Sequence, residues 1–339
     1  MENEQKLLLL CARSRLGERE RAEIARLLSS PLNWEKIKKL AGQQGMVPLL
    51  HNSLSKFKGR VPQDVMEELH NERKKIVRHN MLVFSRARGL LLALKKNKIP
   101  AIIPKGISTA QKFSDDGLKQ VGDIDLLIRR VDIGALEQVL ARQGWLAVHD
   151  YAKTKEQRLK NGCQLPQFAI EGATLDTHWE LNYFVRPEES DLWGDAVPFR
   201  LDGAKALQLS PEKQVCYLCL HSGFSHGMQS LLRDLVDINE TIEYYCCGKG
   251  KAIDWQKLSS TAERWKVSAA VYFCLRMVRE KEKFGNMHVP EKTLASLREK
   301  SNKPQLLVLD LLGDRLLAPL PQNQMRVFRL FLRQAQRLS

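Results

Sequence analysis

The sequence predicts an α+β fold in which a small mixed β-sheet lies between helical regions at the two ends of the chain. Short apolar runs with Pro, Gly or charged residues at their ends occur at 98–106, 121–128 and 167–182, as is typical of strands. Apolar residues at helical spacing recur before and after these runs. We therefore expect three parts: an N-terminal helical region (1–97), an α/β core (98–207) and a C-terminal helical domain (208–339).

The N-terminal region is expected to hold several helices. Asn33 stands where an N-cap residue would, before a helix that ends near Gly45. Residues 61–98 predict one long helix with Pro62 near its start, because apolar residues recur along it every three or four positions. Its many basic residues are interpreted as a solvated face.

The core begins with "KIPAIIPKG" (98–106), which predicts a strand that ends in a turn at Gly106. A helix should follow, and "DIDLLIRR" predicts the second strand. After it we expect a helix with Asp132 as N-cap and Gly144 just past its end. Residues 167–182 predict at least one more strand.

The C-terminal domain is predicted to be helical. Ser210 is a suitable N-cap, and Pro211 occupies the first helical position after it. The tail, residues 322–339, has four arginines and no acid beside an apolar stripe. Such a helix can dock on a membrane or on nucleic acid, but we favour packing of its apolar stripe on the body of the protein.

Composition limits the classes of partner and location. Of the 339 residues, 43% are hydrophobic, which is enough for a large core, and the formal net charge is +15. A basic protein attracts polyanions, including nucleic acid, nucleotides, acidic polysaccharide and anionic membrane. We find neither a secretory signal pattern nor the ~20 apolar residues of a transmembrane segment, so a cytoplasmic protein is expected.

The seven cysteines are odd in number and scattered, which indicates reduced thiols. Four of them invite a zinc interpretation: Cys216, Cys219, Cys246 and Cys247. We favour core thiols at Cys216 and Cys219, which lie in an apolar helical pattern. The adjacent Cys246 and Cys247 make an awkward pair of ligands.

Two carboxylates stand one residue apart at the start of the second predicted strand. Asp123 and Asp125 share one face of it, because successive side chains on a strand point in opposite directions. Carboxylates this close repel unless a hard cation such as Mg²⁺ lies between them. Asp176 on another strand would complete a cluster able to hold two metal ions for phosphoryl or nucleotidyl transfer. Glu180 lies on the same strand face and could take its place.

The turn at "PKGIS" suggests a phosphate site. A glycine that ends a strand and opens a helix allows backbone N–H groups to approach an anion, and the helix N-terminus adds partial positive charge. Lys105 and the hydroxyl of Ser108 are natural additional contacts beside Gly106. Together, the glycine turn and the acidic strands predict binding of a metal ion and a phosphate.

Five segments resemble a known family. They are "AGQQGMVPLLHNSL", "PKGIS", "GDIDLLI", "LDTHWEL" and "LHSGFSHGMQSLLRDLVD". The chain is similar over roughly residues 30–245 to bacterial proteins described as uncharacterised nucleotidyltransferases, within the superfamily that has a DNA polymerase β-like core. The resemblance implies a magnesium-dependent (or manganese-dependent) enzyme with an NTP as substrate.

The resemblance also assigns roles to individual residues. It implies a metal site at the three aspartates and a nucleotide-phosphate turn at Lys105 and Gly106. Two positions depart from the usual pattern: Ile107 follows the turn glycine where Gly or Ser is common, and Lys119 replaces an arginine, which keeps charge but loses bidentate phosphate recognition. The remaining matches, which can act on substrate or be structural, are His178, His221, His226, Arg233 and Asp237.

Two functions from different classes follow from these features. The first is an enzyme that transfers a nucleoside monophosphate from an NTP to an acceptor hydroxyl or phosphate and releases pyrophosphate. The basic charge favours an anionic acceptor, such as RNA, a polysaccharide precursor or a protein. The alternative is a catalytically inactive module on the same fold that senses nucleotide or binds RNA, which the residues at 107 and 119 would favour.

Overall fold

The computed structural model describes residues 2–148, 151–182, 185–225, 231–248, 252–280, 284–303 and 305–306. These residues form an α+β fold in which helices predominate around a small mixed sheet, as predicted. His226 and the basic segment 322–339 lie outside the described residues, so their predicted roles stay predictions. Among the helices that are described, none combines the length and the apolar character needed to cross a bilayer.

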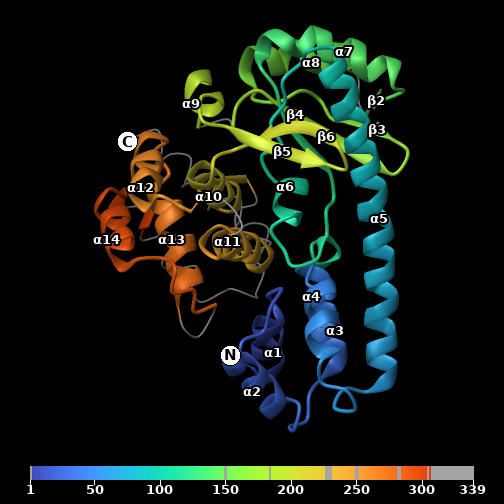
Figure 1. Ribbon diagram of the computed structural model, residues 1–339, viewed down its shortest axis with the longest axis vertical. Helices are drawn as coiled ribbons and strands as arrows, with labels where there is room; N and C mark the ends of the chain where they lie inside the picture. Colours follow the sequence, from blue (N-terminus) through green and yellow to red (C-terminus); the bar gives the residue numbers. More distant parts are fainter. Residues whose placement is uncertain are drawn as a thin grey trace.

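The N-terminal region is helical, and one helix dominates it. The 34-residue helix α5 runs along the length of the molecule, from the four short helices before it to the sheet (Figure 1). Asn33 caps α3 as predicted, because its side chain accepts a hydrogen bond from the Lys36 amide. The helices of this region are α1 (Asn3–Cys11), α2 (Glu18–Leu27), α3 (Trp34–Gln43), α4 (Val47–Leu54) and α5 (Gln63–Lys96).

The central sheet has four strands in the order β1-β4-β3-β2. Strand β1 runs parallel to β4, whereas the other neighbours are antiparallel, so the sheet is mixed. Residues of β4 alternate between buried and partly exposed, which is the predicted period of two. The strands are β1 (Ile124–Leu127), β2 (Leu146–Ala147), β3 (Phe168–Ile170) and β4 (Ala173–His178).

The predicted strand at 98–106 is wrong, because only Ile102 forms a bridge there. Ile102 pairs with Leu127 of β1 on one side and with Leu207 on the other, where the hairpin of β5 (Val197–Leu201) and β6 (Ala204–Gln208) lies. Pro100 and Pro104 have no N–H group for a ladder, which confines regular pairing to the residues between them. This segment therefore joins the hairpin to the main sheet without being a strand.

The connections around the sheet carry short helices. The predicted helix after Gly106 is a single turn, α6 (Ile107–Ala110). Asp132 occupies the N-cap position of α7, but its side chain makes no capping hydrogen bond, and a 3₁₀ turn (η2, Arg130–Asp132) enters the helix instead. The other elements here are η1 (Asp116–Leu118), α7 (Ile133–Arg142), α8 (Tyr151–Asn161) and α9 (Glu189–Trp193).

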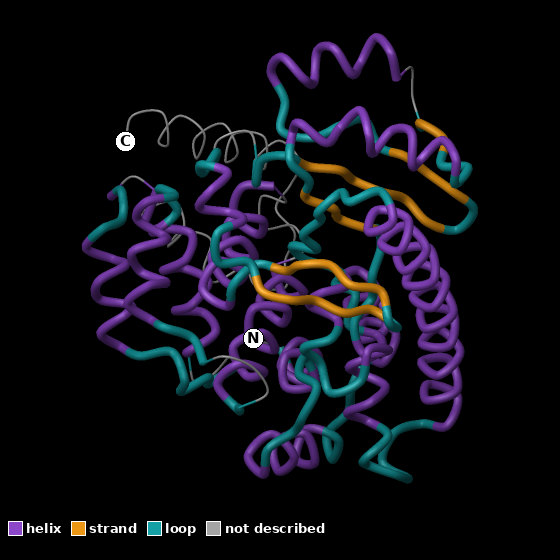
Figure 2. Tube along the Cα trace, turned by 45° about the horizontal axis from the view of Figure 1, so that its top comes forward, coloured by secondary structure: helices purple, strands orange, loops and turns teal. Residues whose placement is uncertain are grey.

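The C-terminal helices pack beside the sheet and the N-terminal helices (Figures 1 and 2). Helix α10 begins at Pro211 after Ser210, as predicted, and continues into a π-helical turn, η3 (His221–Ser225). The helices are α10 (Pro211–Leu220), α11 (Leu231–Cys246), α12 (Trp255–Arg264), α13 (Ser268–Arg279) and α14 (Glu291–Glu299).

Two hydrophobic cores hold these elements together. The first joins the N-terminal helices to α11 and α13, because Leu8 and Leu50 share it with Leu235 and Phe273. The second lies between the sheet and the C-terminal half of α5. The division of the chain at residues 97 and 207 stays a prediction. The first core combines helices from before residue 97 with helices from after residue 207.

The two cysteines of α10 are core thiols, as predicted. Cys216 and Cys219 are fully buried on α10, and the Sγ atom of Cys216 donates to the carbonyl oxygen of Leu258 over 3.7 Å. Neither belongs to a group of potential metal ligands among the described residues. All seven cysteines are free thiols.

Candidate metal and nucleotide site

The three predicted aspartates come together at one edge of the sheet. Asp123 directly precedes β1, Asp125 is in β1, and the parallel register places Asp176 of β4 opposite Asp125. One carboxylate oxygen from each lies within 4.8 Å of the other two. A cluster of carboxylate oxygens is the donor set that hard divalent cations such as Mg²⁺ prefer, so these residues could hold such an ion.

Of the three aspartates, Asp125 has two basic side chains beside its carboxylate. The Nζ atom of Lys105 lies 2.5 Å from Oδ2 of Asp125, and Nε2 of His178 lies 3.6 Å from Oδ1 of the same residue. Burial alone would raise the pKa of Asp125, but these two neighbours hold it below its ordinary value. For Asp123, burial and the charge of Asp125 together raise the pKa, despite Lys105. A bound cation would relieve the repulsion on Asp123.

Lys105 takes part in the same balance. Burial by itself would lower the pKa of this lysine, but Asp125 and Asp123 raise it above its ordinary value. The ammonium group is therefore a permanent positive charge beside the carboxylates.

Gly106 brings backbone close to the cluster in a conformation that only glycine adopts readily. Its φ is 63° and its ψ is −99°. A Cβ atom at this position would lie 3.5 Å from Oδ2 of Asp125 and 3.7 Å from the carbonyl oxygen of Asp123. Because α6 is one turn long, its dipole is weaker than that of the predicted helix, and the backbone turn and Lys105 remain the main attractions for an anion.

Ser108 is fully buried below this turn. Its Oγ atom accepts a hydrogen bond of 3.1 Å from Nε2 of Gln214 on α10, and Oε1 of Gln214 accepts another from the Tyr245 hydroxyl. The predicted contact of Ser108 with a triphosphate stays a prediction. Its observed contacts join α6 to α10.

A cleft of about 340 Å³ opens beside Asp123 and the glycine turn. It brings together residues from three distant parts of the sequence: the turn, the loop before β1, and helices of the C-terminal region. Of the predicted residues, the cleft is lined by Lys105, Gly106, Lys119, Asp123, His221, Arg233 and Asp237.

Lys119 and Asp237 form a buried ion pair across this cleft. The Asp237 carboxylate on α11 accepts a hydrogen bond from Nζ of Lys119. Arg233 packs against Gly45, where a Cβ atom would lie 3.2 Å from its Cδ. The pair holds α11 against the loop that leads into β1.

The two other predicted residues on β4 and after it have different surroundings. His178 is mostly buried and faces Asp125, as described above. Glu180 lies after the end of β4. Burial raises its pKa above the ordinary value, despite the opposing effect of Arg186 and Arg130. Among the described residues, Glu180 is not part of the carboxylate group that could hold a metal.

Sequence reasoning missed two residues that support the site. Nε2 of Gln167 donates to Oδ1 of Asp176 over 3.1 Å, and its place just before β3 could have been inferred from strand pairing. Asn80 is buried in α5, where it donates to the carbonyl oxygen of Lys119 over 2.7 Å and accepts from the Val121 amide over 3.0 Å. An amide side chain in the apolar stripe of a helix was the available signal for Asn80.

Comparison with known proteins decides the family. The sequence matches the family described as Uncharacterised nucleotidyltransferase over residues 30–281. The chain belongs to this family. The match extends past residue 245, where the resemblance was expected to end, and so includes α12 and α13. No curated protein and no solved structure matches the chain.

Proposed function

We propose that this nucleotidyltransferase family member transfers a nucleoside monophosphate from an NTP to an acceptor hydroxyl or phosphate. The observation that carries the proposal is the meeting of three carboxylates in or next to two parallel strands, beside a positive-φ glycine turn and a mostly buried lysine. Mg²⁺ or Mn²⁺ would be held by Asp123, Asp125 and Asp176. When bound, such ions stabilise the attacking and leaving oxygens of an in-line displacement.

The glycine turn and Lys105 would bind the triphosphate. Gly106 has no side chain to separate its backbone from the carboxylates, so a phosphate can approach both at once. Lys105 would supply the positive charge that offsets the phosphate oxygens, in addition to its pairing with Asp125. The cleft would hold the rest of the nucleotide, with Arg233 and His221 in its wall.

The reaction would begin with attack by an acceptor oxygen on the α-phosphorus. A bond forms between these two atoms, the bond from the α-phosphorus to the bridging oxygen breaks, and pyrophosphate leaves. For a hydroxyl acceptor, we assign the proton to Asp176, one of whose oxygens is already fixed by Gln167. The chain's main contribution would be orientation and charge.

The net charge of +15 favours an anionic acceptor, such as RNA, a polysaccharide precursor or an acidic protein. Transfer can be tested with each of the four NTPs labelled at the α-phosphate, in Mg²⁺ or Mn²⁺, with RNA, small-molecule and protein fractions of a cell extract as acceptors. We expect label to enter one fraction with the wild type and not with Asp123→Asn.

A second function is favoured by the Lys119–Asp237 pair. Lys119 stands where the family usually has an arginine, and its ammonium group is already paired with Asp237. A lysine paired in this way suits a module that senses nucleotide without transferring it. Metal-dependent NTP binding without label transfer to any fraction would support this function over catalysis.

A further inference from the structure

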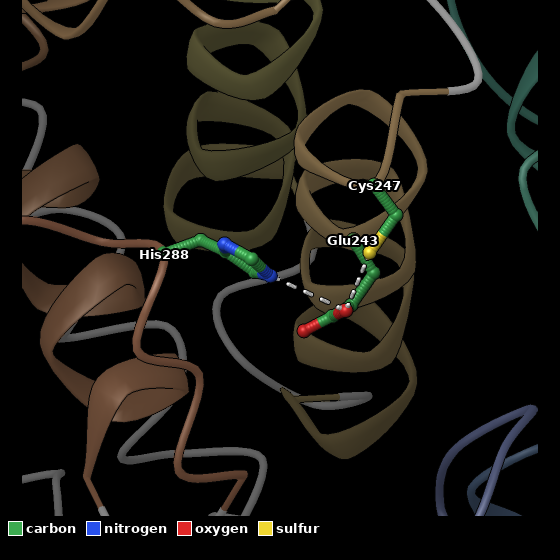
Figure 3. A group of neighbouring side chains, drawn as sticks. All are labelled: Glu243, Cys247 and His288. Atoms are coloured by element: carbon green, nitrogen blue, oxygen red, sulfur yellow. Dashed lines mark hydrogen bonds and ion pairs between the residues drawn. The ribbon is translucent and has the colours of Figure 1, made fainter.

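A second group of potential metal ligands lies at the C-terminal end of α11, apart from the aspartate cluster. Glu243 is in the last turn of α11, Cys247 directly follows the helix, and His288 comes from the loop before α14 (Figure 3). The Sγ atom of Cys247 lies 3.5 Å from Oε2 of Glu243, and Nε2 of His288 lies 3.7 Å from the same oxygen. One ligand atom from each residue lies within 4.8 Å of the other two.

The backbone holds these side chains near one another without a metal. Glu243 and Cys247 are four residues apart, so they lie on one side of the helical turn. The loop with His288 is fixed to α11 by Asn286, whose Nδ2 donates to Oδ1 of Asn239 over 2.9 Å in a buried contact. Oδ1 of Asn286 accepts from the His288 amide over 3.0 Å. Asn239 is one helical turn before Glu243, so the loop is anchored next to the other two ligands.

The chemistry of the donors selects the kind of ion. A thiolate, an imidazole and a carboxylate together suit Zn²⁺, whereas Mg²⁺ and Ca²⁺ take oxygen ligands. Ligands bound to one zinc ion at about 2.0–2.3 Å and a tetrahedral angle are about 3.3–3.5 Å apart, close to the two separations here. The C-terminal end of a helix also carries partial negative charge, which favours a cation.

We propose that Glu243, Cys247 and His288 bind a zinc ion. Three protein ligands leave one tetrahedral position for water or another small ligand. All three residues line a cavity of about 320 Å³, together with Arg13 and Lys112, so a small ligand could reach the ion from there. The bound ion would fasten the loop before α14 to α11. The zinc proposal does not depend on the nucleotidyltransferase activity, because none of the described residues lines both this cavity and the aspartate cleft.

Cobalt binding tests the proposal, because Co²⁺ bound to a thiolate gives a charge-transfer band that carboxylate ligands do not give. We expect the wild type to take up one equivalent of Co²⁺ with this band and to release it when Zn²⁺ is added. Cys247→Ser should abolish the band. His288→Ala should weaken Zn²⁺ affinity by at least the roughly tenfold that loss of even a supporting residue costs.

Two variants serve as controls. Cys246→Ser removes the neighbouring thiol, which is not in the group, and Asp123→Asn alters the other metal cluster; both should keep the band. Absence of the band in the wild type would overturn the proposal. So would its loss in Cys246→Ser, or its persistence at unchanged affinity in His288→Ala. Cys247 and His288 are exposed, so their variants are expected to fold, and circular dichroism checks this.

Discussion

Asp123 and Asp125 are two residues apart and share one cluster, yet their charges are stabilised differently. Asp125 is almost fully buried and is paired with Lys105, whereas Asp123 is raised in pKa by burial and by Asp125. The sequence spacing predicted that both would face one side. It could not show which of the two a lysine from the preceding turn would neutralise.

Asparagine substitutions should therefore have opposite effects on the stability of the metal-free protein. Asp123→Asn removes an unfavourable charge and should raise the melting temperature in EDTA. Asp125→Asn leaves the Lys105 ammonium buried without its partner, which typically costs about 3 kcal/mol or more. Thermal unfolding of both variants checks this, and shifts of the two melting temperatures in the same direction would contradict it.

Gly106 was predicted as a turn residue, and its backbone angles predict that other residues are strained at this position. Gly106→Ala should destabilise the protein by about 1–3 kcal/mol, because an alanine at φ 63° and ψ −99° is strained. It should also weaken NTP binding, since the new methyl group would lie beside Asp125. Gly134→Ala on α7 is a control outside the cleft, as a Cβ there meets no atom of the described residues within 4 Å. Comparable losses in the two variants would argue against a special role for Gly106.

At the scale of elements, the long helix and the acidic strands were predictable because their patterns are local. The strand at 98–106 was not, since two prolines limit its pairing to Ile102, which forms one bridge to β1 and one to β6. Neither was the contact between the loop before β1 and α11. Lys119 and Asp237 are 118 residues apart, so no local pattern could pair them.

The Lys119–Asp237 pair should be strongly coupled. Lys119→Met or Asp237→Asn alone leaves a buried charge without its partner and should cost about 3 kcal/mol, whereas the double variant should cost clearly less than the sum. Denaturant unfolding of the four proteins measures the coupling. Glu72 and Lys75 form an exposed pair on α5, and the same cycle there should give about 0–0.5 kcal/mol. Additive costs at 119 and 237 would show that the buried pair does not join the elements.

At the scale of the whole molecule, the N-terminal helices share one hydrophobic core with α10 to α14, which the order of predicted helices could not reveal. Each amphipathic stripe showed that a helix would be buried but not which helix would cover it. Lys112 is an example of a residue whose burial depends on elements distant in the sequence. Its Nζ donates to Oε1 of Gln208 on β6 and lies 4.6 Å from the ring centre of Tyr244 on α11.

Lys112 should make stability depend on alkaline pH. Burial lowers its pKa to about 8, so between that value and the ordinary 10.5 the unfolded chain binds more protons than the folded one. The contribution of this residue to the free energy of unfolding should therefore rise between pH 8 and 10, by about 2–3 kcal/mol in total. The measurement is the difference between wild type and Lys112→Met, which removes the contribution of other groups. A difference that is constant across this range would contradict the prediction.

The central claim is that the aspartate cluster and the glycine turn together bind an NTP with a divalent metal ion. Isothermal titration of ATP, GTP, CTP and UTP tests it most directly, with Mg²⁺ or with EDTA, on wild type and on Asp123→Asn, which is expected to fold. At least one NTP should bind the wild type only with Mg²⁺ and should not bind the variant. Failure of all four to bind the folded wild type, or equal binding by Asp123→Asn, would contradict it.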